Sequence, residues 1–301
     1  MNNKIKRTVE ERIILVITMI ISIFVFFITA YPIYYSIIFA LSEGRAAMGT
    51  QIYLWPISPT FENFRVVFED HAIFRSFGMS TLRTSVGVFT GVLFTAMVAY
   101  ALTREELRFR RAYAIIAIIT MYFSGGVIPT FLVYRELMIT NTFWVLILPG
   151  MLNVFHMLLF MAFFRELPDA IFESAKIDGA SEMRMLLAIA LPLSKPILAT
   201  VGLFVGVHHW NDWFMPTFFT AGETFHTLPV MLMRMITTAE AQHRLAEVMA
   251  QMGVARAGQQ GLTVESIRHA TMVVSIIPIM MVYPFIQRHF EKGIMLGSIK
   301  A

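Results

Sequence analysis

The segment Glu173-Ser-Ala-Lys-Ile-Asp-Gly-Ala-Ser-Glu-Met-Arg-Met-Leu-Leu-Ala-Ile-Ala-Leu-Pro192 is a polar, charged stretch between two long apolar runs. It begins with a Glu and two small residues, carries Gly179, and ends in Ile-Ala-Leu-Pro. The preceding Pro168-Asp169 is typical of a helix start, where proline and an acidic side chain are both favoured. Gly179 permits a sharp backbone break. We therefore expect two short helices with a low, charged surface that another protein could hold.

The composition is that of an integral membrane protein. The 301 residues are 57% hydrophobic and 15% charged, with a mean hydropathy of +0.66, whereas soluble domains carry about 25% charged residues. Cysteine is absent, which excludes disulfides and thiol chemistry. The sequence pI is about 9.4. Because the basic residues flank apolar runs, we expect them to set membrane orientation and not to bind nucleic acid.

Several apolar runs are long enough to cross a bilayer, which takes roughly 20 helical residues. They are residues 13–39, 81–102, 112–133, 142–164, 196–219 and 270–286. Residues 1–12 form a basic N-terminal segment, and the run that follows is too long for a cleaved signal peptide. The sequence thus predicts an all-α membrane protein with six transmembrane helices in a single domain, 13–301.

Positive residues orient this domain. Most of the 24 Lys and Arg residues lie at the two termini, in the turn 103–111 and in the loop 165–195. Positive loops favour the cytoplasm, so both termini, with segment 1–12, and the 165–195 loop are expected to be cytoplasmic. Residues 220–269 are then an external loop, in which apolar residues at helical spacing over 245–252 predict a surface helix.

Two of the predicted spans carry glycines four residues apart. The pairs are Gly87 with Gly91 and Gly202 with Gly206. Small residues at this spacing let helix backbones approach closely in lipid, so we expect these spans to pack tightly against neighbours.

The chain lacks the motifs of enzymes that make or break covalent bonds. It contains no GxxxxGK[ST] phosphate-binding loop, no HExxH and no GxSxG. A secondary transporter would need inverted repeats and charged residues at mid-membrane, and Asp212 is the only carboxylate candidate of that kind. A transport subunit without activity of its own is favoured, and a non-transporting scaffold or sensor remains an alternative.

The 173–192 segment resembles the cytoplasmic coupling loop of ABC-importer permeases, which reads Glu-Ala-Ala, three residues, Gly, nine residues, Ile-x-Leu-Pro. Only Ser174 departs, standing where Ala is usual. Further stretches are similar to the carbohydrate-uptake branch, especially its oligosaccharide or polysaccharide-fragment type. These are Met121–Thr130, Asn141–Pro149, Trp210–Trp213, and Tyr283–Gln287 with Lys292-Gly293.

The resemblance implies a type I ABC-importer permease fold, similar to the smaller membrane subunit of the maltose importer, in the bacterial cytoplasmic membrane. It implies a heterodimer with a second permease, two ATP-binding cassette subunits and an extracytoplasmic sugar-binding protein. ATP and magnesium would be bound by the ATPase partners, with no cofactor or metal in this chain. Coupling to the ATPase would fall to Glu173, Ser174, Ala175, Asp178, Gly179, Ala180 and Pro192.

The substrate path is expected to involve polar and aromatic residues inside the spans, because such residues are costly in lipid and tend to face a cavity or partner helix. The candidates are Trp210, Asn211, His208, Tyr122 and Asn153, with His156 a weaker one. Aromatic rings stack on sugars and amides bond their hydroxyls. Alternatively, Trp210 and Trp213 form an interface belt. The pair His208-His209 would suit an acidic sugar, and import of a non-sugar solute stays open.

Overall fold

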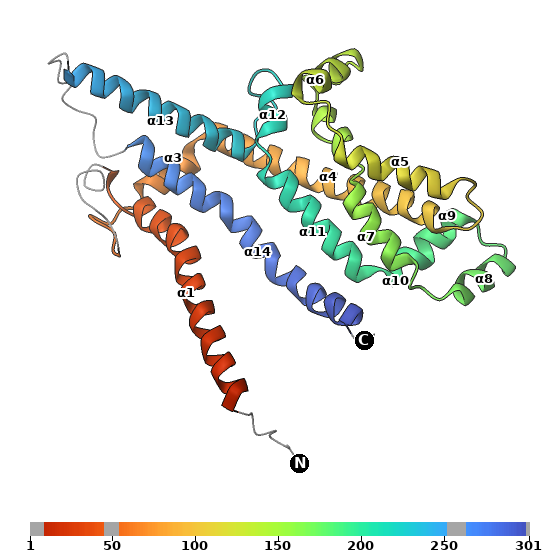
Figure 1. Cartoon of the computed structure of the whole chain (residues 1–301). Helices are drawn as coiled ribbons and strands as arrows, with labels where there is room; N and C mark the ends of the chain where they lie inside the picture. The colour runs from red at the N-terminus through yellow and green to blue at the C-terminus, as the bar shows by residue number, and fades with distance from the viewer. Residues whose placement is uncertain (1–8, 45–53, 252–262, 299–301) are drawn as a thin grey trace. The chain divides into compact units, whose positions relative to one another are not determined.

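A computed structural model describes residues 9–44, 54–251 and 263–298 (Figure 1). Apart from a bridge between Ser42 and Pro59, these residues form helices, turns and loops. The first helices are α1 (Val9–Ala40), α3 (Glu62–Glu69), α4 (His71–Thr103), α5 (Arg110–Tyr122) and α6 (Val127–Glu136). The short 3-10 helices η1 (Phe143–Leu146) and η2 (Leu148–Gly150) lead into α7 (Val154–Phe164).

The second half of the chain continues with shorter elements. They are α8 (Asp169–Ile177), α9 (Glu182–Met185), the π-helix η3 (Leu186–Ala190), α10 (Leu191–Leu193), α11 (Lys195–Asn211) and α12 (Phe214–Phe219). The last two helices are long, α13 (Leu228–Gln251) and α14 (Val264–Ser298). Helix α13 confirms the helix expected within 220–269 up to Gln251, and residue 252 lies outside the described residues.

Three helices are long and apolar enough to cross a membrane: α1, α4 and Val264–Met281 of α14. Two bent pairs qualify if each counts as one span. They are Phe143–Gly150 with Val154–Phe164, bent by 47°, and Glu182–Leu193 with Lys195–Asn211, bent by 87°. The described residues therefore hold three to five candidate spans, where the sequence predicted six.

The predicted span 112–133 is interrupted, as its Ser124-Gly125-Gly126 and Pro129 indicate. Helix α5 ends at Tyr122, and α6 begins only at Val127 after an unwound stretch in which Gly126 has φ +80°. Such a φ is readily available only to glycine. Pro129 also removes a backbone donor near the start of α6. The break explains why this segment is absent from the candidate spans among the described residues.

Two other predicted boundaries also differ from the structure. Helix α4 begins at His71, well before the expected start of the span at 81. The predicted span 196–219 is interrupted at Asp212, which is extended and separates α11 from α12. An Asp favours such a break because its carboxylate can accept hydrogen bonds from the N–H groups of the next helix.

The chain divides into two compact units, Met1–Asp70 with Met235–Ile276, and His71–Arg234 with Ile277–Ala301. In the first unit the end of α1 is fixed by Asn63 of α3, whose amide donates to the backbone oxygens of Ala40 and Ser42, both at 2.8 Å. The Phe39 ring lies 4.6 Å from the ring of His269 on α14. The remainder of α1 exposes its apolar side chains, as a lipid-facing helix does.

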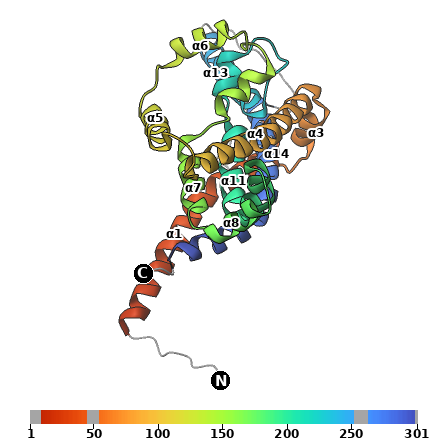
Figure 2. The ribbon, with the colours of Figure 1, turned by 90° about the vertical axis from the view of Figure 1, so that its right-hand side faces the viewer.

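Helix α4 is the central element of the second unit and packs along both α11 and α7 (Figures 1 and 2). Both glycine pairs lie at the α4–α11 crossing, which confirms the close packing expected of them. A Cβ at Gly87 would lie 2.4 Å from Nε2 of His209, and one at Gly206 would lie 3.4 Å from the Val88 side chain. The core around this crossing extends to Phe160, Phe172 and Met185.

Candidate functional site

Helices α8 and α9 form the hairpin expected for residues 169–185. Asp169 opens α8 directly after Pro168. Gly179 between the two helices has φ +76° and open space around it. The Ser181 hydroxyl caps α9 by accepting the N–H of Arg184 at 3.3 Å. The predicted helix start and the glycine break are therefore both confirmed.

Aromatic packing fixes the base of α8 to the C-terminal end of α4. Phe172 of α8 is buried, and its ring centroid lies 6.3 Å from that of Tyr100. The guanidinium carbon of Arg104 sits over both rings, 4.3 Å from the Tyr100 centroid and 4.1 Å from the Phe172 centroid. Cation–π contacts of this kind hold the hairpin against α4.

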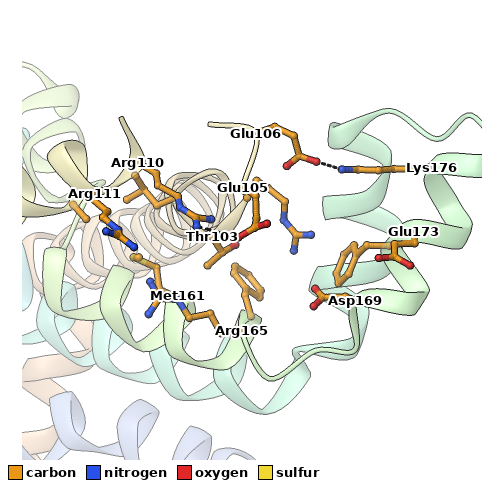
Figure 3. A pocket seen from close by; sticks show the side chains of 15 residues that line it. Thr103, Glu105, Glu106, Arg110, Arg111, Met161, Arg165, Asp169, Glu173 and Lys176 are labelled. Atoms are coloured by element: carbon orange, nitrogen blue, oxygen red, sulfur yellow. Dashed lines mark hydrogen bonds and ion pairs between the residues drawn. The ribbon is translucent and has the colours of Figure 1, made fainter. Parts of the chain in front are cut away.

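Charged groups add a second connection between the hairpin and the turn after α4. Lys176 of α8 is hydrogen-bonded to Glu106 (Figure 3), and it lies 3.7 Å from Glu182 of α9. The Tyr100 hydroxyl donates to Glu182 at 3.1 Å. The hydrogen bond from Lys176 lowers the pKa of Glu106, and the same bond raises the pKa of Lys176. Both groups are thus charged at neutral pH.

The coupling candidates fall into two groups by exposure. Glu173, Ser174, Asp178 and Gly179 are exposed, whereas Ala175 and Ala180 are half-buried and pack against the core. Sequence reasoning missed Ile177, whose side chain is 87% exposed at the end of α8. The only signal for Ile177 in the sequence is its position as an apolar residue between the charged Lys176 and Asp178. Small and apolar groups thus alternate with charges on the surface that a partner would meet.

Pro192, the last coupling candidate, lies where the hairpin returns to the apolar α11. It stands in the first turn of α10, directly after the π-helical η3, and Pro196 stands in the first turn of α11. Proline lacks the N–H that a continuous helix needs. The two prolines therefore account for the 87° bend between Glu182–Leu193 and α11.

A pocket of about 710 Å³ opens beside α8, between the turn after α4, the start of α5 and the end of α7. Figure 3 shows Arg110, Arg111 and Arg165 on the side of α5 and α7, and Asp169 and Glu173 on the side of α8. Its lining also includes the apolar residues Ala114, Met161 and Phe164. Glu105 and Glu106 on the turn after α4, and Lys176 on α8, also line the pocket, so each side carries both signs of charge.

A buried ion pair joins α4 to the α11–α12 junction. One Arg83 nitrogen donates to the backbone oxygen of Asp212 at 3.0 Å, and another bonds its carboxylate. The second carboxylate oxygen accepts the N–H groups of Phe214 and Met215 at 2.9 and 3.2 Å. The Arg83 side chain is 1% exposed. Sequence reasoning noticed Asp212 and missed Arg83, although an arginine inside a predicted span was itself a signal.

The substrate-path candidates are placed differently from one another. His208, Asn211, Tyr122 and Asn153 are exposed. Asn153 also caps α7 by accepting the N–H of His156 at 3.1 Å. Trp210 is buried, with its ring edge-on to Phe77 at 6.0 Å, so stacking on a sugar would require this ring to move. A substrate contact stays a prediction for each of them.

Comparisons with known proteins identify the family of the chain. No protein-family model matches the chain. Over 273 residues, 91% of the chain and 90% of the relative, it is 35% identical to Protein LplC of Bacillus subtilis (strain 168). It is 32% identical, over 91% of its length and 93% of the relative, to the polygalacturonan/rhamnogalacturonan transport system permease protein YtcP of the same organism.

A solved structure resembles the fold closely. It is a crystal structure of a bacterial ABC transporter involved in the import of the acidic polysaccharide alginate, and the match covers 94% of this chain and 99% of that one. The TM-score is 0.83 and the identity 27%. The fold is therefore that of an ABC-importer permease. The chain belongs to the family of carbohydrate ABC-importer permease subunits, which are integral membrane proteins that transport and are not enzymes.

Proposed function

We propose that this permease subunit forms half of the translocation pathway for acidic oligosaccharides, such as fragments of uronic-acid polymers. The observation that carries the coupling role is the exposed α8–α9 hairpin, fixed at its base to α4 by Arg104 and Lys176. The relative YtcP is named for polygalacturonan and the structural neighbour for alginate, and both polymers are acidic. The exposed His208 on α11 could meet a carboxylate in this path.

The proposed topology has six crossings, with both termini and the 165–195 loop in the cytoplasm and 220–269 outside. Helices α5 and α6 together supply one crossing. Unwound backbone at membrane depth is tolerated only inside protein or beside water. Residues 123–126 are exposed in the described chain, so we place them toward the pathway or the second permease. If the break faces the pathway, Tyr122, 75% exposed, lies beside the substrate.

The proposed partners are a second permease, two ATPase subunits and an external binding protein that delivers the sugar, all at the bacterial cytoplasmic membrane. The ATPase would hold the hairpin, with Glu173 and Asp178 fixing its position and the small Ser174 and Ala175 allowing close approach. ATP and magnesium would be bound by the ATPase pair. Closure of that pair would move the hairpin and, through it, α4.

The test is ATP hydrolysis by the assembled importer in lipid vesicles, stimulated by binding protein loaded with an oligogalacturonate. Gly179→Leu should abolish stimulation and leave membrane insertion intact, because a side chain at φ +76° is strained and protrudes from the hairpin. The matched control is Gly222→Leu, since Gly222 has φ +72° and open space around it, outside the hairpin. Full stimulation with Gly179→Leu would contradict the coupling role.

The substrate class is tested separately with the unaltered importer. Uptake of oligogalacturonates and alginate oligomers is compared with uptake of neutral maltooligosaccharides and glycerol 3-phosphate. Equal or better uptake of a neutral sugar would exclude the acidic preference, and uptake of glycerol 3-phosphate alone would exclude the sugar assignment. Neither result would affect the role of the hairpin.

A further inference from the structure

The pocket beside α8 has more positive groups than its own carboxylates neutralise. Arg110 is paired with Glu105 at 3.1 Å, and Lys176 with Glu106. Among the described residues, no ion pair forms at the other lining arginines, Arg104, Arg111 and Arg165. Against them stand Asp169 and Glu173, on the opposite side of the pocket (Figure 3). The unpaired groups carry a net charge of one positive.

The arginine side of the pocket suits a phosphate. Guanidinium groups offer several donors in a planar fork that matches phosphate oxygens. Nε of Arg104 is buried without a hydrogen-bond partner among the described residues. The guanidinium is held over the rings of Tyr100 and Phe172, so it is fixed beside the pocket before any anion arrives.

The position of the pocket suits a lipid. It lies where α4 and α7 end and α5 begins, which is the level of phospholipid headgroups if these helices cross the membrane. Ala114 of α5 lines the pocket, and α5 continues away from it with exposed Ile115, Ile116 and Ile119. Acyl chains could lie along that face. Basic pockets between helix ends on the cytoplasmic side are typical headgroup sites.

We propose that this pocket binds the phosphate of an anionic phospholipid such as phosphatidylglycerol. The phosphodiester lies between Arg104, Arg111 and Arg165, and the headgroup hydroxyls donate to Asp169. One bound lipid then contacts the turn after α4, the end of α7 and α8 together, so the membrane surface stabilises the position of the coupling hairpin. The inference rests on the proposed membrane placement, but it does not depend on the sugar.

The test uses the full chain in neutral detergent, with bound lipid counted by native mass spectrometry. The double variant Arg111→Gln/Arg165→Gln is compared with Arg108→Gln/Arg135→Gln, which removes the same charge from residues that do not line the pocket. Each basic side chain near an anionic surface contributes about a five-fold change in affinity. We expect phosphatidylglycerol binding to weaken about thirty-fold in the pocket variant and less than about three-fold in the control.

Three competition experiments, with phosphatidylcholine, inorganic phosphate and the ATPase, distinguish the possible occupants of the pocket. Phosphatidylcholine should bind at least about ten-fold more weakly, and inorganic phosphate should not displace the lipid. Equal losses in the two variants would reduce the site to general charge attraction and overturn the proposal. Displacement by millimolar phosphate would assign the pocket to a soluble anion instead. Lipid release on adding the ATPase, with the pocket variant losing ATPase binding, would assign it to that protein. None of these readouts requires transport, so failure here is separate from failure of the proposed function.

Discussion

The contact between Gly87 and His209 gives the sharpest prediction about the spans. A Cβ added at Gly87 would lie 2.4 and 2.5 Å from two atoms of the His209 ring. Distances this short require the ring or the helices to move. The ring is 3% exposed, and Gly150 borders it at 3.6 Å, measured from a Cβ built there. Gly87→Ala should therefore force α4 away from α11.

The magnitude follows from two opposing terms. Overpacking a well-packed site costs about 1–3 kcal/mol, while replacing glycine by alanine in a helix returns up to about 1 kcal/mol. We expect Gly87→Ala to lower the free energy of unfolding by about 1–2 kcal/mol. At Gly91 the nearest atom to an added Cβ is 3.5 Å away, and at Gly78 none lies within 4 Å. Alanine at either control position should therefore be neutral or stabilising.

The assay is denaturant unfolding of the purified chain in mixed micelles, with His209→Ala and the double variant completing a cycle. Removing the imidazole leaves room for the new methyl group, so the two changes should couple by at least about 1 kcal/mol, with the double variant more stable than the sum predicts. Additive effects would refute the close contact. So would a Gly87→Ala variant as stable as Gly91→Ala.

Three further predictions concern polar and exposed groups. Arg83→Ala should cost about 3–5 kcal/mol, because it leaves the Asp212 carboxylate buried without its partner; Asp212→Asn should cost less, since the amide oxygen still caps α12. Unfolding in mixed micelles measures both, and a loss below about 0.5 kcal/mol for Arg83→Ala would contradict the pairing. Ile177→Ala should weaken ATPase co-purification about ten-fold without changing stability, as expected for an exposed anchor residue; Ile128→Ala, 75% exposed on α6, is the control. Lys176→Gln should speed amide exchange in α8 at pH 7. Because the pKa of Glu106 is lowered from 4.5, the stability that this carboxylate contributes is present above pH 4.5 and is lost as the pH falls through the folded-state pKa. Because the pKa of Lys176 is raised from 10.5, the stability that the ammonium group contributes is lost only when the pH rises beyond 10.5. Variant and wild type should therefore converge in acid, and a difference that persists there would exclude the Glu106 bond as its cause.

The sequence predicts features that depend on local chemistry better than those that depend on distant neighbours. The α8–Gly179–α9 hairpin follows from proline, a left-handed glycine and a serine cap, all read within a few residues. The glycine pairs at 87 and 202 predicted close packing, but not that His209 would be the neighbour of Gly87. Ser124-Gly125-Gly126 and Pro129 indicate an interruption of the span 112–133, and the break at 123–126 lies there. Three basic residues meet their partners only through the fold. Arg83 and Asp212 are 129 residues apart in the sequence, Arg104 and Phe172 are 68 apart, and Lys176 and Glu106 are 70 apart.

Helix α4 connects the two candidate sites. Arg83 lies 21 residues before Arg104, and at about 1.5 Å per residue the two are separated by roughly 30 Å, close to the thickness of the bilayer core. At its C-terminal end α4 contacts the α8–α9 hairpin through Tyr100 and through Arg104, which directly follows the helix. Within its N-terminal half, α4 holds the α11–α12 junction through Arg83 and Asp212, directly beside Asn211. Between these two arginines, α4 packs closely against α11 at Gly87. A displacement of the hairpin can therefore reach the candidate path by moving one rigid helix, provided both end contacts persist. Loss of either the Arg104 or the Arg83 contact is therefore expected to uncouple ATP hydrolysis from transport, whereas loss of Glu106 alone leaves the aromatic connection and only weakens coupling.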